Sequence, residues 1–215
     1  GANPAGPAAG TPRFMKGKAG KPGKTGAGVL PFALHAGQVR FLLHKTFSGR
    51  RAGLLVDFGG GARAGETAFQ TAAREFVEET EGLFLAPDIR QAALAGGEYQ
   101  RQLQDMQALL ARARDEQPDW YCRRRVPPGK PARDWRTFFV EVDYRDVTGM
   151  NAAWAADAGR RFKKRRELLW VPAEQLLEIF ARQPEQLWKR VRELEGAPDI
   201  IIAVRQAREG RLPSG

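Results

Sequence analysis

A strand-like segment, three consecutive glycines and an amphipathic segment follow one another between residues 54 and 80. Residues 54–58 are predicted to form a short buried strand, and Gly59 to Gly61 a loop whose backbone is free to adopt positive φ. From Thr67 to Thr80 the apolar residues recur at the spacing of a helix, as Ala68, Ala72, Phe76 and Val77 show. A strand, glycine loop and helix in this order indicate an α/β protein.

Three carboxylates mark the predicted helix. Glu75, Glu78 and Glu79 stand at positions i, i+3 and i+4, so their side chains project from one helix face. Two carboxylates about 4 Å apart repel by roughly 4 kcal/mol at an effective dielectric constant near 20. Mg²⁺, or Mn²⁺ in its place, prefers oxygen ligands and would relieve this repulsion. The spacing therefore predicts a metal site.

The glycines and Arg74 add a second element to this site. Where no side chain intervenes, backbone carbonyls or amides can approach a metal or a phosphate group closely. Arg74 could clamp a substrate, but Glu78 lies four residues later and Glu66 at the start of the helix. A structural ion pair is the favoured role for this arginine.

The segment resembles the Nudix box, whose glycine, glutamates and arginine recur at fixed spacing. The matching residues are Gly60, Glu66, Arg74, Glu75, Phe76, Glu78 and Glu79. Phe76 matches only as an apolar residue, and the other six positions each require one residue type. The probability that these six match by chance in such a chain is on the order of one in a hundred thousand. The chain departs from the pattern at Glu81, where the family has glycine; Gly82 and Leu83 each come one place late.

The resemblance implies a fold, a cofactor and a mechanism. Glu75, Glu78 and Glu79 would bind magnesium with the Gly60 carbonyl, and together with Arg74 they form the expected catalytic set. Glu66 would brace Arg74. Water activated by metal would attack a phosphorus atom of a phosphoanhydride. Glu79 and Glu167 are the alternative candidates for the general base.

The remaining pattern fits a Nudix-like α/β/α sandwich with a mixed sheet. We expect one domain over residues 28–212, containing a hairpin over 27–45, a helical insertion at about 88–115 and C-terminal helices at about 184–208. Further strands are predicted at 120–125, 137–144 and 167–171, and a helix at 173–181. No apolar run approaches the roughly 20 residues of a membrane span.

The charge of +10 is concentrated near the start of the chain. No Asp or Glu precedes Asp57, and residues 1–56 hold nine of the 35 Lys and Arg residues, which leaves 26 basic against 25 acidic residues in the remainder. Residues 1–27, rich in Gly, Pro and Lys, are expected to form a disordered tail. Met15 could be the natural start. The single cysteine, Cys122, indicates no disulfide framework, so a cytoplasmic location is expected.

Two basic segments outside the box are candidate substrate-binding residues. Arg123 and Arg125 lie beside Trp120 and Tyr121, where they could clamp a base and a phosphate, although packing explains the aromatic residues equally well. Lys163 and Lys164 belong to a basic run at 160–166, which is either a solvated loop or a polyphosphate contact. His35 and His44 show no ligand pattern, and no catalytic or metal role is expected for them.

These observations favour a metal-dependent pyrophosphohydrolase. Its substrate would be a phosphorylated small molecule, either a nucleoside diphosphate-linked or a polyphosphate compound. One alternative is an enzyme that removes a 5′ pyrophosphate or cap from RNA, with the basic tail following the nucleic-acid backbone. The other is a ligand-sensing domain without catalysis. The sequence identifies no dimer interface, although a dimer occurs in some branches of the family.

Overall fold

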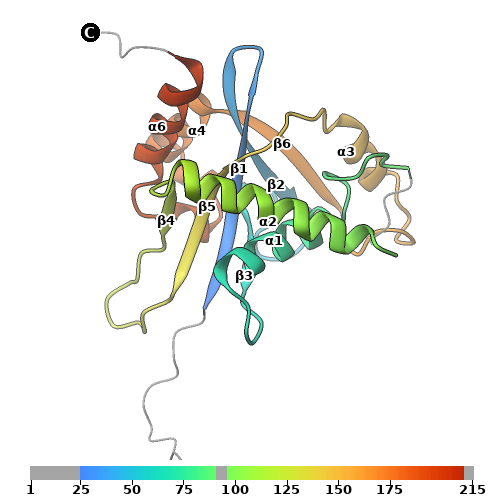
Figure 1. Ribbon diagram of the computed structural model, residues 1–215, viewed down its shortest axis with the longest axis horizontal. Coiled ribbons are helices and arrows are strands. Elements are labelled where there is room, and N and C mark those ends of the chain that lie inside the picture. Colours follow the sequence, from blue (N-terminus) through green and yellow to red (C-terminus); the bar gives the residue numbers. More distant parts are fainter. Residues whose placement is uncertain (1–24, 91–95, 211–215) are drawn as a thin grey trace, which may run out of the picture.

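The computed structural model describes residues 25–90 and 96–210, and six strands of this part form one mixed sheet (Figure 1). The strand order is β4-β5-β1-β2-β6, and β3 pairs with β1 beside this path. Among the paired strands of this sheet, β1 and β5 run parallel and the other four pairs run antiparallel. The strands are β1 (Gly26–His35), β2 (Gln38–Thr46), β3 (Phe58–Gly61), β4 (Tyr121–Arg123), β5 (Trp135–Glu141) and β6 (Arg166–Pro172).

Helices cover both faces of this sheet, so the expected α/β/α sandwich is confirmed. One apolar cluster joins the sheet to α1 (Ala68–Glu79), α2 (Glu98–Glu116) and α3 (Thr148–Ala155). A second cluster joins the opposite face to α4 (Ala173–Arg182), α5 (Lys189–Arg192) and α6 (Ala197–Glu209), with the 3₁₀ helix η1 (Pro184–Gln186) between α4 and α5. In Figure 1, α2 crosses in front of the sheet, and α4 and α6 lie next to each other at the upper left.

The central strand β1 explains why the sheet needs two helical layers. Its first eight residues are all buried, as expected for a strand that is covered on both faces. It then turns into β2 through Ala36 and Gly37, which both have positive φ. Two such residues between antiparallel strands suit the right-handed twist of a hairpin, and the predicted hairpin is confirmed.

The glycine segment differs from its prediction. Phe58 to Gly61 form strand β3, and none of the three glycines has positive φ. They are needed because other groups lie against the backbone. A Cβ on Gly59 would lie 2.7 Å from Gly28 Cα, and one on Gly60 would lie 2.5 Å from the Glu75 carboxylate. The strand predicted at 54–58 is therefore wrong except for its last residue; Leu55 and Val56 form only isolated bridges.

Other boundaries shift by smaller amounts. Gly26 and Ala27 belong to β1 rather than to the expected tail, whose residues 1–24 lie outside the described part. The insertion contributes the single helix α2, and residues 91–95 are not described. The C-terminal helices expected at about 184–208 are η1, α5 and α6, while α3 was not predicted. In the described part of the chain, no helix combines the length and apolarity that crossing a bilayer requires.

Candidate active site

Helix α1 presents the carboxylate row formed by Glu75, Glu78 and Glu79. The helix begins at a capping box, in which the Thr67 hydroxyl accepts from the Gln70 amide and the Gln70 side chain accepts from the Thr67 amide. The side chain of Glu79 is 7% exposed, that of Glu75 17% and that of Glu78 35%. The row therefore runs from a buried acid to an accessible one.

Arg74 fastens the loop before α1 to the helix. Its Nε and Nη2 donate to the two Glu66 carboxylate oxygens at 2.7 and 2.9 Å, and Nη2 also donates to the Gly61 carbonyl at 2.9 Å. The hydrogen bonds from Arg74 lower the pKa of Glu66 to about 2. Through Nη1, Arg74 also contacts Glu75 at 2.9 Å and Glu78 at 3.3 Å. Arg74 thus forms the structural ion pairs with Glu66 and Glu78 that the sequence favoured.

Glu79 is held between β3 and two strands of the sheet. Its Oε1 accepts from the Gly59 amide at 2.7 Å, and its Oε2 lies 3.3 Å from His44 Nε2 and 3.5 Å from Arg166 Nη1. Burial opposes ionisation of Glu79, but the neighbouring His44, followed by Arg190 and Arg166, lowers its pKa overall.

His44 lies between Glu79 and Arg166. Burial lowers its pKa more than the neighbouring Glu79 raises it. Arg166 Nη1 lies 2.9 Å from His44 Nε2, the nitrogen that also faces Glu79. Glu79 Oε2 has charged neighbours but no hydrogen bond, although it is fully buried.

The carboxylate row fits a divalent cation by its chemistry. Burial first, and then the charge of Glu79, raise the pKa of Glu75, so the acids repel each other as the spacing predicted. Gly60 leaves room for the Glu75 carboxylate against the backbone, and the buried Glu79 Oε2 lacks a donor. Within the described ranges, however, no three His, Cys, Asp or Glu side chains converge as a metal cluster. Arg74 instead holds Glu75 and Glu78.

Residues that the sequence did not assign to the carboxylate row complete its surroundings. His44 on β2, Arg51 after β2 and Arg166 on β6 surround Glu79 Oε2. Tyr99 of the insertion helix α2 donates to Glu78 Oε1 at 3.1 Å. Only strand pairing and helix packing bring these residues together, and no local motif indicated that they meet here.

The four predicted substrate residues lie in two groups, at or next to opposite edge strands of the sheet. Arg123 is on the edge strand β4, where its guanidinium lies over Tyr121, and the Arg125 amide donates to Glu193. Lys163 and Lys164 precede β6 at the opposite edge. Burial, followed by the charges of Arg51 and Arg166, lowers the pKa of Lys164. The two groups are therefore not parts of one clamp.

Glu167 lies away from the carboxylate row. Along β6, Leu168 and Trp170 pack in the cluster that contains α1, whereas Leu169 and Val171 pack in the opposite cluster. Because strand side chains alternate between faces, Glu167 shares the face of Leu169. This placement argues against Glu167 as a general base for chemistry at α1.

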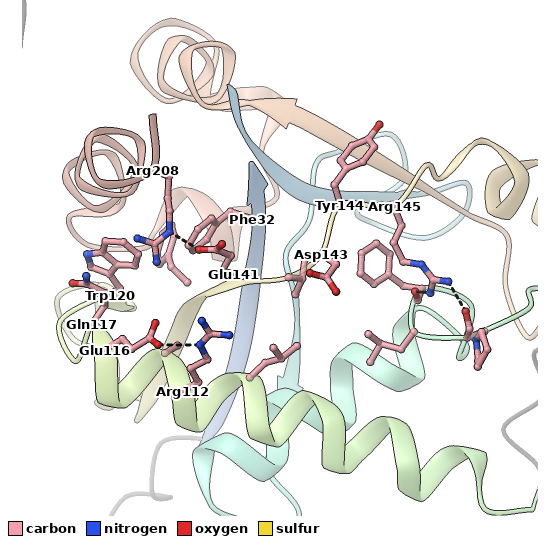
Figure 2. Close-up of a pocket in the computed structure, with 18 residues that line it drawn as sticks. Phe32, Arg112, Glu116, Gln117, Trp120, Glu141, Asp143, Tyr144, Arg145 and Arg208 are labelled. Carbon is pink, nitrogen blue, oxygen red and sulfur yellow. Dashed lines mark hydrogen bonds and ion pairs between the residues drawn. The ribbon is translucent and has the colours of Figure 1, made fainter. Parts of the chain in front are cut away.

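A cavity of about 500 Å³ lies beside α2 and the end of β5. Figure 2 shows two ion pairs on its wall, Arg112 with Glu116 and Arg208 with Glu141, and shows Asp143 between these pairs and Arg145. None of the three carboxylates of α1 lines this cavity.

Comparisons with known proteins give structural likeness only. No protein-family model matches this chain, and no curated protein sequence does. An Ap4A hydrolase of C. elegans, in a binary complex, is 15% identical over 87% of this chain and 99% of its own, with a TM-score of 0.46. A NUDIX hydrolase from Alicyclobacillus acidocaldarius is 18% identical over 90% and 98%, also with a TM-score of 0.46. The NUDIX domain of Shewanella oneidensis NrtR, complexed with ADP ribose, is 16% identical over 92% and 94%, with a TM-score of 0.39.

Proposed function

We propose that this chain is a Nudix-type hydrolase that cleaves a phosphoanhydride bond at the carboxylate row of α1. The observation that carries the proposal is the arrangement of Glu75, Glu78 and Glu79 on one helix face, against a glycine strand that Arg74 fastens to the same helix. The Glu66 brace on Arg74 matches the role that the Nudix resemblance implies for it.

Glu75, Glu78, Glu79 and the Gly60 carbonyl would hold magnesium, with manganese as a substitute. When bound, the cation supplies positive charge that stabilises the phosphates and the attacking water. Glu79 suits the role of ligand, because its lowered pKa keeps it ionised. Arg74 keeps Glu75 and Glu78 oriented, and the Gly59 amide orients Glu79.

The test is hydrolysis of a substrate panel in Mg²⁺ or Mn²⁺ by the native chain and by Glu78→Gln. The panel contains ADP-ribose, dinucleoside polyphosphates, nucleoside triphosphates, an inositol pyrophosphate and 5′-triphosphorylated RNA. We expect Glu78→Gln to reduce turnover about 100-fold. Changing a residue that only supports a metal ligand already lowers metal affinity or activity about 10- to 100-fold. Glu178→Gln on α4 is the matched control, because Glu178 lies in the other helical layer and pairs with the exposed Arg182.

The outcomes separate the alternatives. Metal-dependent turnover that Glu78→Gln reduces about 100-fold and Glu178→Gln preserves supports the hydrolase. Hydrolysis of the RNA substrate alone would assign the chain to RNA 5′-end processing. Metal binding without turnover of any compound would contradict the catalytic proposal and favour a ligand-sensing domain.

A further inference from the structure

Two loops meet beside the buried end of the carboxylate row. Strand β2 ends at Thr46, which pairs with Arg166 at the start of β6. The segment after β2, which carries Arg51, and the segment before β6, which carries Lys164, therefore leave the sheet at the same end. The Gly53 amide donates to the Thr46 carbonyl at 3.0 Å, which returns the first segment towards β2.

Three cations gather at this point, which we call the cation cluster: Arg51, Lys164 and Arg166. Arg166 Nη1 lies 3.5 Å and Arg51 Nη2 3.8 Å from Glu79 Oε2. Lys164 lies within electrostatic range of both arginines and of Glu79. The side chain of Arg51 is 24% exposed and that of Arg166 is 10% exposed.

The nearby acids do not satisfy these cations. Glu79 provides one negative charge against three positive ones, and its Oε2 forms no hydrogen bond. Glu75 is engaged by Arg74, and Glu81 accepts from the Lys163 amide and from Trp154 Nε1. His44 adds no negative charge.

Arg166 gives a second, independent sign of a missing partner. Its Nη1 contacts His44, but its Nε is fully buried and has no hydrogen-bond partner. An unpaired buried donor on a charged group is costly, and a neutralising role towards Glu79 does not explain it. An arginine fork with a free donor suits a phosphate oxygen.

We propose that the cation cluster binds a phosphoryl group beyond the two that are joined by the cleaved anhydride. The preferred substrate is then a phosphate-rich small molecule with three or more phosphoryl groups, rather than a compound with one diphosphate linkage. This inference rests on the proposed function for the position of the cleaved bond. Arg51 and Lys164 are accessible enough to contact the anion. The more buried Arg166 orients it from the interior side of the cluster.

Calorimetric titration with inorganic tripolyphosphate and with pyrophosphate tests the cluster without turnover. We expect the native chain to bind tripolyphosphate more tightly, and Arg51→Gln and Lys164→Gln each to weaken that binding about tenfold, equivalent to about 1.4 kcal/mol. Arg165→Gln is the matched control. It removes the same charge from the same segment, but the Arg165 guanidinium lies over Phe47, 3.8 Å from the ring centroid.

Equal weakening by Arg165→Gln would show that only the overall charge matters and would overturn the proposal. So would equal affinity of the native chain for the two anions, or unchanged tripolyphosphate binding in Arg51→Gln and Lys164→Gln. Circular dichroism of each variant excludes misfolding as the cause of a loss. Because the titration needs no catalysis, it remains decisive even if no substrate is hydrolysed.

The KM values of different substrates then identify which class of phosphorylated compound binds the cation cluster. Lys164→Gln should raise KM about tenfold for diadenosine tetraphosphate or an inositol pyrophosphate and less than twofold for ADP-ribose. Equal increases for all of these substrates would contradict a separate phosphate contact. A selective increase confined to 5′-triphosphorylated RNA would overturn the assignment to a small molecule.

Discussion

At the residue scale, neighbouring glycines of β3 have different surroundings. A Cβ on Gly60 would lie 2.5 Å from Glu75 Oε1, whereas one on Gly61 would meet no atom within 4 Å. The glycine pattern alone did not distinguish the two positions. Their different neighbours make them a matched pair for testing how closely the backbone must approach the carboxylate row.

We expect Gly60→Ala to displace the Glu75 carboxylate and to reduce hydrolysis about 100-fold, because a displacement of about 1 Å at a reacting centre can cost that much. Stability should fall by less than about 1 kcal/mol, since the contacted group is the end of a flexible side chain. Gly61→Ala should change neither the rate of hydrolysis nor the free energy of unfolding. Turnover and urea denaturation of both variants check this, and equal activities would show that the close approach has no role.

Glu66 makes the stability of the chain depend on pH. Its pKa is about 2 in the folded protein, against an ordinary value of 4.5. The stabilisation from its ion pair with Arg74 is therefore fully present above about pH 4.5 and is lost as pH falls towards 2.

Glu66→Gln should remove this dependence. The difference in unfolding free energy between the native chain and Glu66→Gln should be largest near neutral pH and should shrink as pH falls from 4.5 towards 2. Urea denaturation at a series of pH values measures it. A difference that stays constant over this range would contradict the assigned pKa.

At the scale of elements, helix α1 owes its boundary to its own sequence. Thr67 and Gln70 satisfy each other's backbone amides at its start, and the buried residues Ala72, Phe76 and Val77 pack it on the sheet. The helix ends where Glu81 and Gly82 both adopt positive φ. Glu81 thus adopts the backbone conformation for which glycine is preferred, and its carboxylate accepts from Trp154 and Lys163.

We expect Thr67→Ala to lower the free energy of unfolding by about 1 kcal/mol, because it leaves the Gln70 amide without its cap. Thr67→Ser keeps a hydroxyl and should stay within a few tenths of a kcal/mol of the native chain. The midpoints of urea denaturation give the comparison. If the alanine and serine variants unfold at the same concentration, the capping box does not stabilise the helix.

At the scale of the whole molecule, a buried ion pair connects the second helical layer to Asp57, the residue directly before β3. Arg190 of α5 donates to Asp57 Oδ1 through Nε at 2.9 Å and Nη2 at 2.6 Å. Thr137 of β5 donates to the other carboxylate oxygen at 3.2 Å. Asp57 comes two residues before Gly59, whose amide holds Glu79. The C-terminal helices thus help to fix the carboxylate row.

Arg190→Met should destabilise the chain by about 3–5 kcal/mol, because it leaves the fully buried Asp57 charge without its partner. Asp57→Asn combined with Arg190→Met should cost less than the sum of the two single changes, with a coupling of about 1–3 kcal/mol. A double-mutant cycle by denaturation checks this. Additive effects would mean that the pair does not act as a unit.

The sequence by itself determined the helix α1, the direction of its three carboxylates, the ion pairs of Arg74 with Glu66 and Glu78, and the mixed sandwich that surrounds them. These features follow from local periodicity and from a motif with fixed spacing, so nearby residues are enough to predict them. Only the tertiary structure decided that the three glycines form a strand, that Glu167 faces the opposite layer, and that His44, Arg51 and Arg166 surround Glu79. These contacts depend on strand register and helix packing between segments far apart in the chain, which no local pattern records.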